Sequence, residues 1–156
     1  MWLGLSIIVA AAGSASAENL DVEGLWLTDD GSAHVRIAPC GSDDQGPCGA
    51  LAWIDPAVQE AETDVNNPDP ALQARPLIGL PIIWGFQRKK DDWRKGRIYD
   101  PEDGKTYRSR ITLKEDGTLQ VKGCVGPVCR SLIWTRVSEP TLVGDDAGET
   151  GDVSDQ

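Results

Sequence analysis

The feature that most constrains the fold of this 156-residue chain is a regular succession of short strand-like segments separated by turn sequences. The clearest segment, 105–113, places Tyr107 and Ile111 on one side and Arg108 and Arg110 on the other. This two-residue period is typical of a strand with one buried face. Strands are predicted over 23–28, 32–39, 49–54, 78–86, 96–100, 105–113, 118–124 and 128–137, with turns at 29–31, 101–104, 115–117 and 126–127 and one long irregular loop over 55–76. About eight short strands at this spacing predict an all-β domain, either a sandwich or an up-and-down antiparallel barrel.

The two ends of the chain differ from the domain between them. Residues 1–17 carry no charge, contain an apolar run and end in the small triplet Ala15-Ser16-Ala17, which is the pattern of a secretory signal peptide. Residues 138–156 hold six acidic residues and no basic one, a composition typical of disorder. We therefore predict a signal peptide over 1–17, one barrel domain over 18–137 and a disordered acidic tail over 138–156, with export across the inner membrane to the periplasm.

The number and spacing of the four cysteines are consistent with an exported protein. Cys40 and Cys48 bracket one loop of small and turn residues, and Cys124 and Cys129 bracket a shorter one. An even number of cysteines in a secreted domain predicts disulfides. Three pairings are open, and pairing within each loop is the simplest because each turn already brings its two ends together. A zinc site is the alternative, but the chain has no Cys-x-x-Cys and His34 is its only histidine, so no metal or cofactor is expected.

The charge of the chain excludes one class of partner. A formal net charge of -10 lacks the concentrated basic footprint of a nucleic-acid-binding protein. The only basic concentration lies within 88–97, and we interpret it as a solvated hairpin tip. The alternative is contact with an anionic membrane surface through Arg88, Lys89, Lys90, Arg94 and Lys95.

A short motif at each end of the domain points to a family of barrels. Gly24-Leu25-Trp26, on the first predicted strand, resembles the Gly-x-Trp of lipocalins and their barrel relatives. Arg136, on the last predicted strand, matches the basic residue that packs across that tryptophan in those barrels. A guanidinium over an indole face stabilises by about 0.5–2 kcal/mol. The resemblance implies that Gly24, Trp26 and Arg136 close one end of a lipocalin-like barrel.

The domain as a whole resembles an uncharacterised family of small exported bacterial proteins, a domain of unknown function. The resemblance is carried, in order along the chain, by residues 24–26, 64–68, 77–80, 96–101, 104–107 and 134–136. It implies a lipocalin-like fold and a periplasmic or envelope location, and it implies no biochemical role. The two cysteine loops are additions to the family pattern.

Residues 64–69 concentrate polar side chains in the long loop. Their oxygens suit a cation such as calcium, which takes six to eight oxygen ligands, but the spacing is not that of an EF-hand loop. Asn and Asp before Pro also form ordinary turns by hydrogen-bonding their own backbone, and we favour that interpretation. Asp64, Asn67 and Pro68 are therefore predicted to anchor the long loop at the barrel mouth.

Aromatic and basic side chains on the predicted strands suit two different barrels. An eight-stranded barrel either holds one small ligand or is filled by its own side chains, and the sequence fits both. For a hollow barrel the ligand-binding candidates are Trp53, Trp84, Tyr99, Tyr107, Arg108 and Arg110. An interior of tyrosine and arginine would suit a polar or anionic ligand.

No residue pattern indicates catalysis. A nucleophilic site needs a base beside the nucleophile, whereas His34 lies in an alternating segment beside Arg36 and is interpreted as an outward structural residue. We therefore expect an exported non-enzyme that binds a small polar or anionic ligand in its barrel. The alternative is a non-catalytic interaction or structural module of the envelope with a side-chain-filled barrel. The ligand, any envelope protein partner and the oligomeric state remain open.

Overall fold

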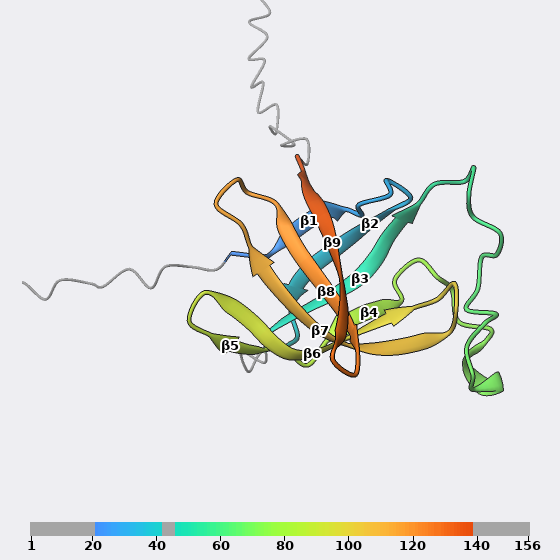
Figure 1. Cartoon of the computed structure of the whole chain (residues 1–156). Helices are drawn as coiled ribbons and strands as arrows, with labels where there is room; N and C mark the ends of the chain where they lie inside the picture. Colours follow the sequence, from blue (N-terminus) through green and yellow to red (C-terminus); the bar gives the residue numbers. More distant parts are fainter. Residues whose placement is uncertain (1–20, 42–45, 139–156) are drawn as a thin grey trace, which may run out of the picture.

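The computed structural model describes residues 21–41 and 46–138 as a β-barrel with a long loop at one side (Figure 1). The strands are β1 (Gly24–Leu27), β2 (Ala33–Pro39), β3 (Pro47–Ile54), β4 (Pro81–Trp84), β5 (Gln87–Lys89), β6 (Asp92–Asp100), β7 (Lys105–Leu113), β8 (Leu119–Val125) and β9 (Val128–Val137). The long loop contains one 3-10 turn, η1 (Pro70–Leu72). The predicted signal peptide and all but the first residue of the predicted tail lie outside the described residues.

Eight of these strands close into an antiparallel ring. The sheet runs in the order β4-β3-β2-β1-β9-β8-β7-β6-β5, and a further pairing of β4 with β6 joins its two sides. In that pairing Ile83 lies opposite Ile98 and Trp84 lies opposite Arg97. β5 pairs only with β6, so it lies outside the ring. The predicted all-β antiparallel barrel is confirmed, with one strand added outside it.

Two segments differ from the sequence prediction. The strand expected over 78–86 begins only at Pro81, because Gly79 takes a φ of 87° and the Leu80 amide turns back to donate to the Leu77 carbonyl. The basic run forms an exposed hairpin, β5–β6, as expected, but the hairpin is longer than predicted and pairs Gln87 with Arg94. β6 therefore starts at residue 92, earlier than the predicted 96.

One end of the barrel, called the base here, is sealed around Trp26. The guanidinium of Arg136 lies 4.4 Å from the Trp26 ring centroid and donates to the carbonyl oxygens of Glu23 (2.6 Å) and Asp21 (2.8 Å). A Cβ on Gly24, which has a φ of +124°, would lie 2.7 Å from Arg136 Nη1. Trp26 is fully buried and its indole N–H donates to the Val22 carbonyl. Residues 21–26 and the last strand are thus held together across the base.

Above this seal the lower half of the barrel is packed with side chains. Strands alternate buried and exposed residues as a two-residue period requires, as in β2, where Val35 and Ile37 are buried and Arg36 is exposed. The buried core of the barrel includes Trp26, Val35, Ile37, Ile83, Phe86, Ile111, Leu119, Val121 and Trp134. Close packing of this set excludes a ligand from the base.

The opposite end, called the mouth here, collects three connections and the long loop. These connections are the β1–β2 turn, the β6–β7 turn and the β8–β9 hairpin, because antiparallel strands place alternate turns at one end. The long loop, residues 55–80, leaves β3 at this end and returns to β4 on the right of Figure 1. The mouth is therefore built from connections, whereas the base is built from packed strands.

Two disulfides join the cysteines within each predicted loop, Cys40 with Cys48 and Cys124 with Cys129. The predicted local pairing is confirmed. Two disulfides are typical of a protein that works in an oxidising, extracytoplasmic environment. No helix within residues 21–41 and 46–138 has the length and apolarity needed to cross a membrane.

Candidate functional site

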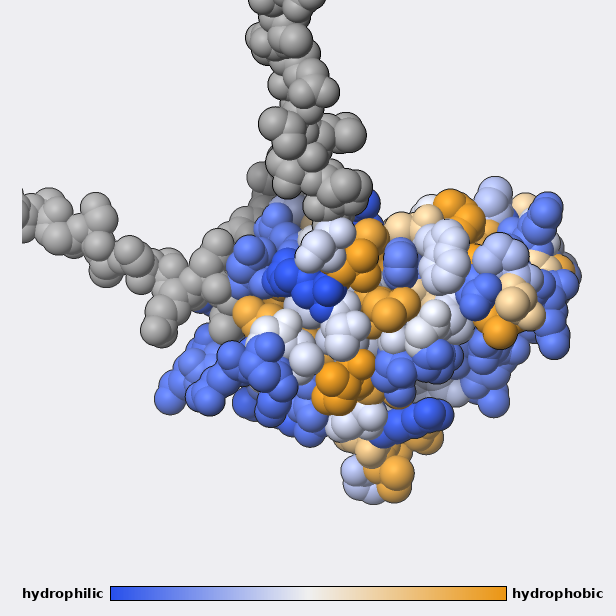
Figure 2. Space-filling view, turned by 90° about the horizontal axis from the view of Figure 1, so that it is seen from above, coloured by the Kyte–Doolittle hydropathy of each residue, from blue (hydrophilic) through white to orange (hydrophobic). Residues whose placement is uncertain are grey.

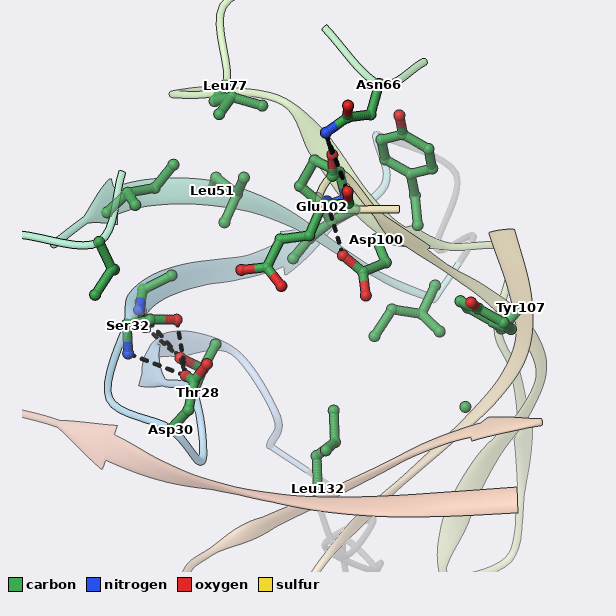
Figure 3. Close-up of a pocket in the computed structure, with 18 of the residues that line it drawn as sticks. Thr28, Asp30, Ser32, Leu51, Asn66, Leu77, Asp100, Glu102, Tyr107 and Leu132 are labelled. Atoms are coloured by element: carbon green, nitrogen blue, oxygen red, sulfur yellow. Dashed lines mark hydrogen bonds between the residues drawn. The ribbon is translucent and has the colours of Figure 1, made fainter. Parts of the chain in front are cut away.

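A cavity of about 860 Å³ opens at the mouth of the barrel. Its walls are apolar side chains that point inward from four strands: Leu51 on β3, Ile82 on β4, Ile98 on β6 and Leu132 on β9. Trp134 lies deeper on β9 and also lines it. Figure 3 shows Leu51, Tyr107 and Leu132 around the space, with Asn66 and Leu77 of the long loop along its upper edge. Ligand sites commonly have this size and a largely apolar lining.

The long loop is attached to the barrel wall through one buried carboxylate. Asp64 is fully buried and accepts hydrogen bonds from the Tyr99 hydroxyl (2.6 Å), Asn67 Nδ2 (2.8 Å) and Arg75 Nη2 (2.8 Å). Burial alone would raise the pKa of Asp64, but these hydrogen bonds outweigh it and lower that pKa. Burial and the hydrogen bond to Asp64 raise the pKa of Tyr99 to about 12. The network fixes the loop to β6 with Asp64 ionised and Tyr99 neutral.

The same loop also contacts the β6–β7 turn. Asn66 Nδ2 donates to the carbonyls of Pro101 (3.1 Å) and Glu102 (3.0 Å). A Cβ on Gly104 would lie 1.9 Å from the Asn66 carbonyl oxygen, so this approach requires glycine. Residues 64–68 and 99–104, far apart in sequence, therefore meet at the mouth. Asp64 and Asn67 lie where the anchoring hypothesis placed them, and Pro68 is exposed beside them.

Carboxylates gather at the rim of the cavity. Asp29 and Asp30 come from the β1–β2 turn, Glu60 from the long loop, Asp100 from the end of β6 and Glu102 from the β6–β7 turn. Figure 3 shows the carboxyl groups of Asp100 and Glu102 projecting toward the space. Arg130, on β9, also lines the cavity. The rim therefore carries more negative than positive formal charge.

Of the six ligand-binding candidates, the four aromatic residues separate into two that line the cavity and two that do not. Tyr99 and Tyr107 line the cavity. Trp53 is exposed on the outside, with its ring centroid 4.8 Å from that of His34, and Trp84 packs against the core without lining the cavity.

The two arginine candidates correct the expectation of an arginine-lined interior. Arg108 is exposed and donates to the Gly126 carbonyl, and Arg110 Nη1 lies 3.7 Å from Asp92. They lie on the outer face because Tyr107, Ser109 and Ile111 take the inward positions of β7.

The basic residues considered for membrane contact lie in the β5–β6 hairpin, at the base side of the barrel (Figure 1). Arg94 donates to Asp92 Oδ1 at 2.8 Å, so part of this charge is neutralised within the hairpin. Membrane contact through this hairpin stays a prediction.

Sequence reasoning missed the apolar wall and the acidic rim. The alternation of β9 already separated Leu132 and Trp134 from Ile133, which is exposed on the outer face. The acidic residues carried no such signal, because Asp and Glu in turns are ordinary turn formers.

On the face seen in Figure 2, hydrophobic residues are scattered among hydrophilic ones rather than gathered in one broad patch.

Two comparisons place the chain among known proteins. Residues 24–136 match the family model described as "Uncharacterized protein conserved in bacteria (DUF2147)". The structure is similar to that of protein HP1028 from the human pathogen Helicobacter pylori, which belongs to the lipocalin family. The TM-score is 0.65 and the identity 22%, over 76% of this chain and 84% of that one. No curated protein is detectably similar to the chain. The chain belongs to the DUF2147 family of uncharacterised bacterial proteins, and its fold is a lipocalin-like barrel.

Proposed function

We propose that this protein binds a small molecule in the mouth of its barrel and is not an enzyme. The observation that carries the proposal is the cavity of about 860 Å³ above a sealed and packed base. A barrel that is sealed at its base and open at its mouth has one entrance, as a binding site for a small ligand requires. The fold shared with a lipocalin supports this proposal.

The wall of the cavity supports an apolar ligand body. Leu51 and Ile82 are buried in the wall, and Ile98 and Leu132 are half-buried beside them. Transfer of apolar surface from water to such a wall is favourable by about 25 cal/mol per Å². The filled-barrel alternative describes only the lower half of this molecule, and the upper half has room for a ligand.

The setting of the proposed function is the periplasm. The two disulfides favour an oxidising compartment, and residues 1–17 have the composition of an export signal. The non-catalytic assignment is supported by the position of His34, which contacts Trp53 on the outer face, and by the engagement of all four cysteines in disulfides.

The test is binding of a neutral apolar probe, N-phenyl-1-naphthylamine, followed by its own directly excited fluorescence. Leu132→Trp places a larger side chain in the cavity wall. Ile133→Trp adds the same side chain to the outer face of the same strand and serves as the matched control. We expect wild type and Ile133→Trp to bind alike and Leu132→Trp to bind about tenfold more weakly. Equal binding by folded Leu132→Trp would place the probe elsewhere and overturn the proposal.

A further inference from the structure

We propose that the mouth cavity selects an amphiphile with a cationic head, a protonated amine or quaternary ammonium, on an apolar body. This inference rests on the proposed binding function and names its ligand class. It replaces the polar or anionic ligand expected from the sequence, because Arg108 and Arg110, on which that expectation depended, lie outside the cavity.

The charges that line the cavity are strongly unbalanced. Among the described residues, five carboxylates line it, from Asp29, Asp30, Glu60, Asp100 and Glu102, against the single guanidinium of Arg130. They come from three separate parts of the chain, the β1–β2 turn, the long loop and the end of β6 with the turn that follows it, so the barrel topology rather than one acidic stretch brings them together. Among residues 21–41 and 46–138, the ion pairs involve Asp64, Asp92 and Asp103 and none of these five.

Two of the carboxylates are held in place by local hydrogen bonds. Asp30 Oδ1 accepts from Thr28 Oγ1 (2.7 Å), the Ser32 amide (3.0 Å) and Ser32 Oγ (2.8 Å). Burial raises the pKa of Asp30, but these bonds outweigh it and lower that pKa, so the group stays ionised. Asp100 Oδ1 accepts from the Glu102 amide at 2.9 Å. A fixed carboxylate loses little conformational freedom when it meets a cation.

Glu102 lies where the negative charges converge. Partial burial and the neighbouring Asp100, Asp30 and Glu60 raise the pKa of Glu102, in that order. Figure 3 shows its carboxyl group extending from the β6–β7 side toward the β1–β2 turn that carries Asp30. A cationic head at this position would be attracted by several carboxylates at once, whereas an anionic head would be repelled by all of them.

A second and independent feature marks the deep part of the same cavity. Trp134 is 2% exposed, lines the cavity, and its indole Nε1–H has no hydrogen-bond partner within the described residues. Buried donors are normally satisfied, and this one lies beneath the floor of the cavity. The lining itself suits a molecule with a cationic head at the rim and an apolar body along Leu51 and Leu132.

The test compares three decyl amphiphiles of equal chain length, each below its micelle concentration, as competitors of N-phenyl-1-naphthylamine. Their heads are trimethylammonium, sulfate and maltoside. We expect the cationic compound to bind about tenfold more tightly than the sulfate at low salt, with the difference shrinking in 0.5 M salt because exposed charges are screened. Equal binding of cationic and anionic compounds would overturn the inference.

Charge-neutralising variants test whether the preference for a cationic head depends on the carboxylates at the rim. Asp100→Asn with Glu102→Gln keeps the acceptor oxygens and removes two charges. Asp91→Asn with Glu115→Gln removes two exposed charges from turns away from the cavity and is the matched control. We expect the rim variant to lose about five- to tenfold in affinity for the cation, a larger loss than it shows for the neutral probe, and the control to keep both affinities.

The outcomes separate the two proposals. If the neutral probe binds at the Leu132 wall but the rim variant keeps full affinity for the cation, only the cationic preference fails. If the neutral probe does not bind at all, the proposed function itself fails.

Discussion

The hydroxyl of Tyr99 donates a 2.6 Å hydrogen bond to Oδ1 of Asp64, and this contact joins two residues that lie 35 positions apart. Tyr99 is on β6 and lines the cavity, while Asp64 is in the long loop. The contact therefore connects the loop over the mouth directly to the barrel wall. The position of the loop determines the shape of the cavity entrance.

Tyr99→Phe should destabilise the protein. The change removes one partner of a fully buried carboxylate, and leaving a buried polar group short of a partner costs about 1–3 kcal/mol. Urea denaturation should show this loss in the free energy of unfolding. Tyr107→Phe is the control, since the Tyr107 hydroxyl donates to the exposed Asp103, and its loss should be smaller. An equal effect of the two variants would contradict the anchoring role of Asp64.

Asp64→Asn should change how stability depends on pH in acid. The pKa of Asp64 is lower in the folded protein than its ordinary value of 3.8, so its contribution to stability is present above that value and is lost as pH falls through the folded pKa. The difference in free energy of unfolding between wild type and Asp64→Asn should therefore be constant from pH 5 to pH 7. It should shrink as pH falls below about 4. A difference that stays constant down to pH 2 would show that folding does not lower the pKa of Asp64, and one that grows as pH falls from 7 to 5 would show that Asp64 is not ionised in the fold.

Gly24→Ala should destabilise more than Gly31→Ala. Both glycines have a positive φ, +124° and +73°, but only a Cβ on Gly24 would meet Arg136, at 2.7 Å, whereas nothing lies within 4 Å of one on Gly31. An alanine costs about 1–2 kcal/mol in the left-handed helical region, where Gly31 lies, and the excess at Gly24 combines the rarer φ of that residue with the loss of the Arg136 seal over Trp26. Thermal or urea unfolding measures both. The excess should shrink in an Arg136→Ala background, and an undiminished excess there would assign it to backbone strain alone.

Much of the barrel could be predicted from the sequence because strand alternation and turn chemistry are local signals. β7 and β9 have the bounds expected from their alternation, 105–113 and 128–137. Cys124 and Cys129 pair across the turn that their spacing indicated. Trp26 and Arg136, at opposite ends of the domain, meet as the resemblance to lipocalins implied.

The cavity could not be predicted, because alternation tells which way a side chain points and not at what height in the barrel. Ile111 and Leu132 both face inward, yet Ile111 is part of the packed core while Leu132 borders open space. Nor does spacing in the sequence show that Asp30 and Glu102 share one rim. That juxtaposition depends on which turns the closed barrel places at the same end, and the closing pair is β4 with β6.

The β5–β6 hairpin was predicted in kind but not in extent. Its charged residues form an exposed hairpin as expected, whereas β6 begins at residue 92 rather than 96. The chain reverses at Lys90, which has a φ of 41°, and a lysine in that conformation is uncommon, so the local sequence did not indicate how far the paired strands extend.

The most direct test of the account is the intact mass of the protein purified from cells that express the full chain, recorded under native and then denaturing conditions. We predict extra mass on the wild-type protein that is released on denaturation, and a much smaller share of ligand-bound protein for Leu132→Trp, because the cavity wall holds the ligand. The denatured polypeptide should be lighter by the four hydrogens lost in forming Cys40–Cys48 and Cys124–Cys129, which checks the disulfides in the same experiment. Equal ligand mass on wild type and Leu132→Trp, or a bare native mass in a protein that also fails to bind the neutral probe, would contradict the claim that the mouth of this barrel is a binding site.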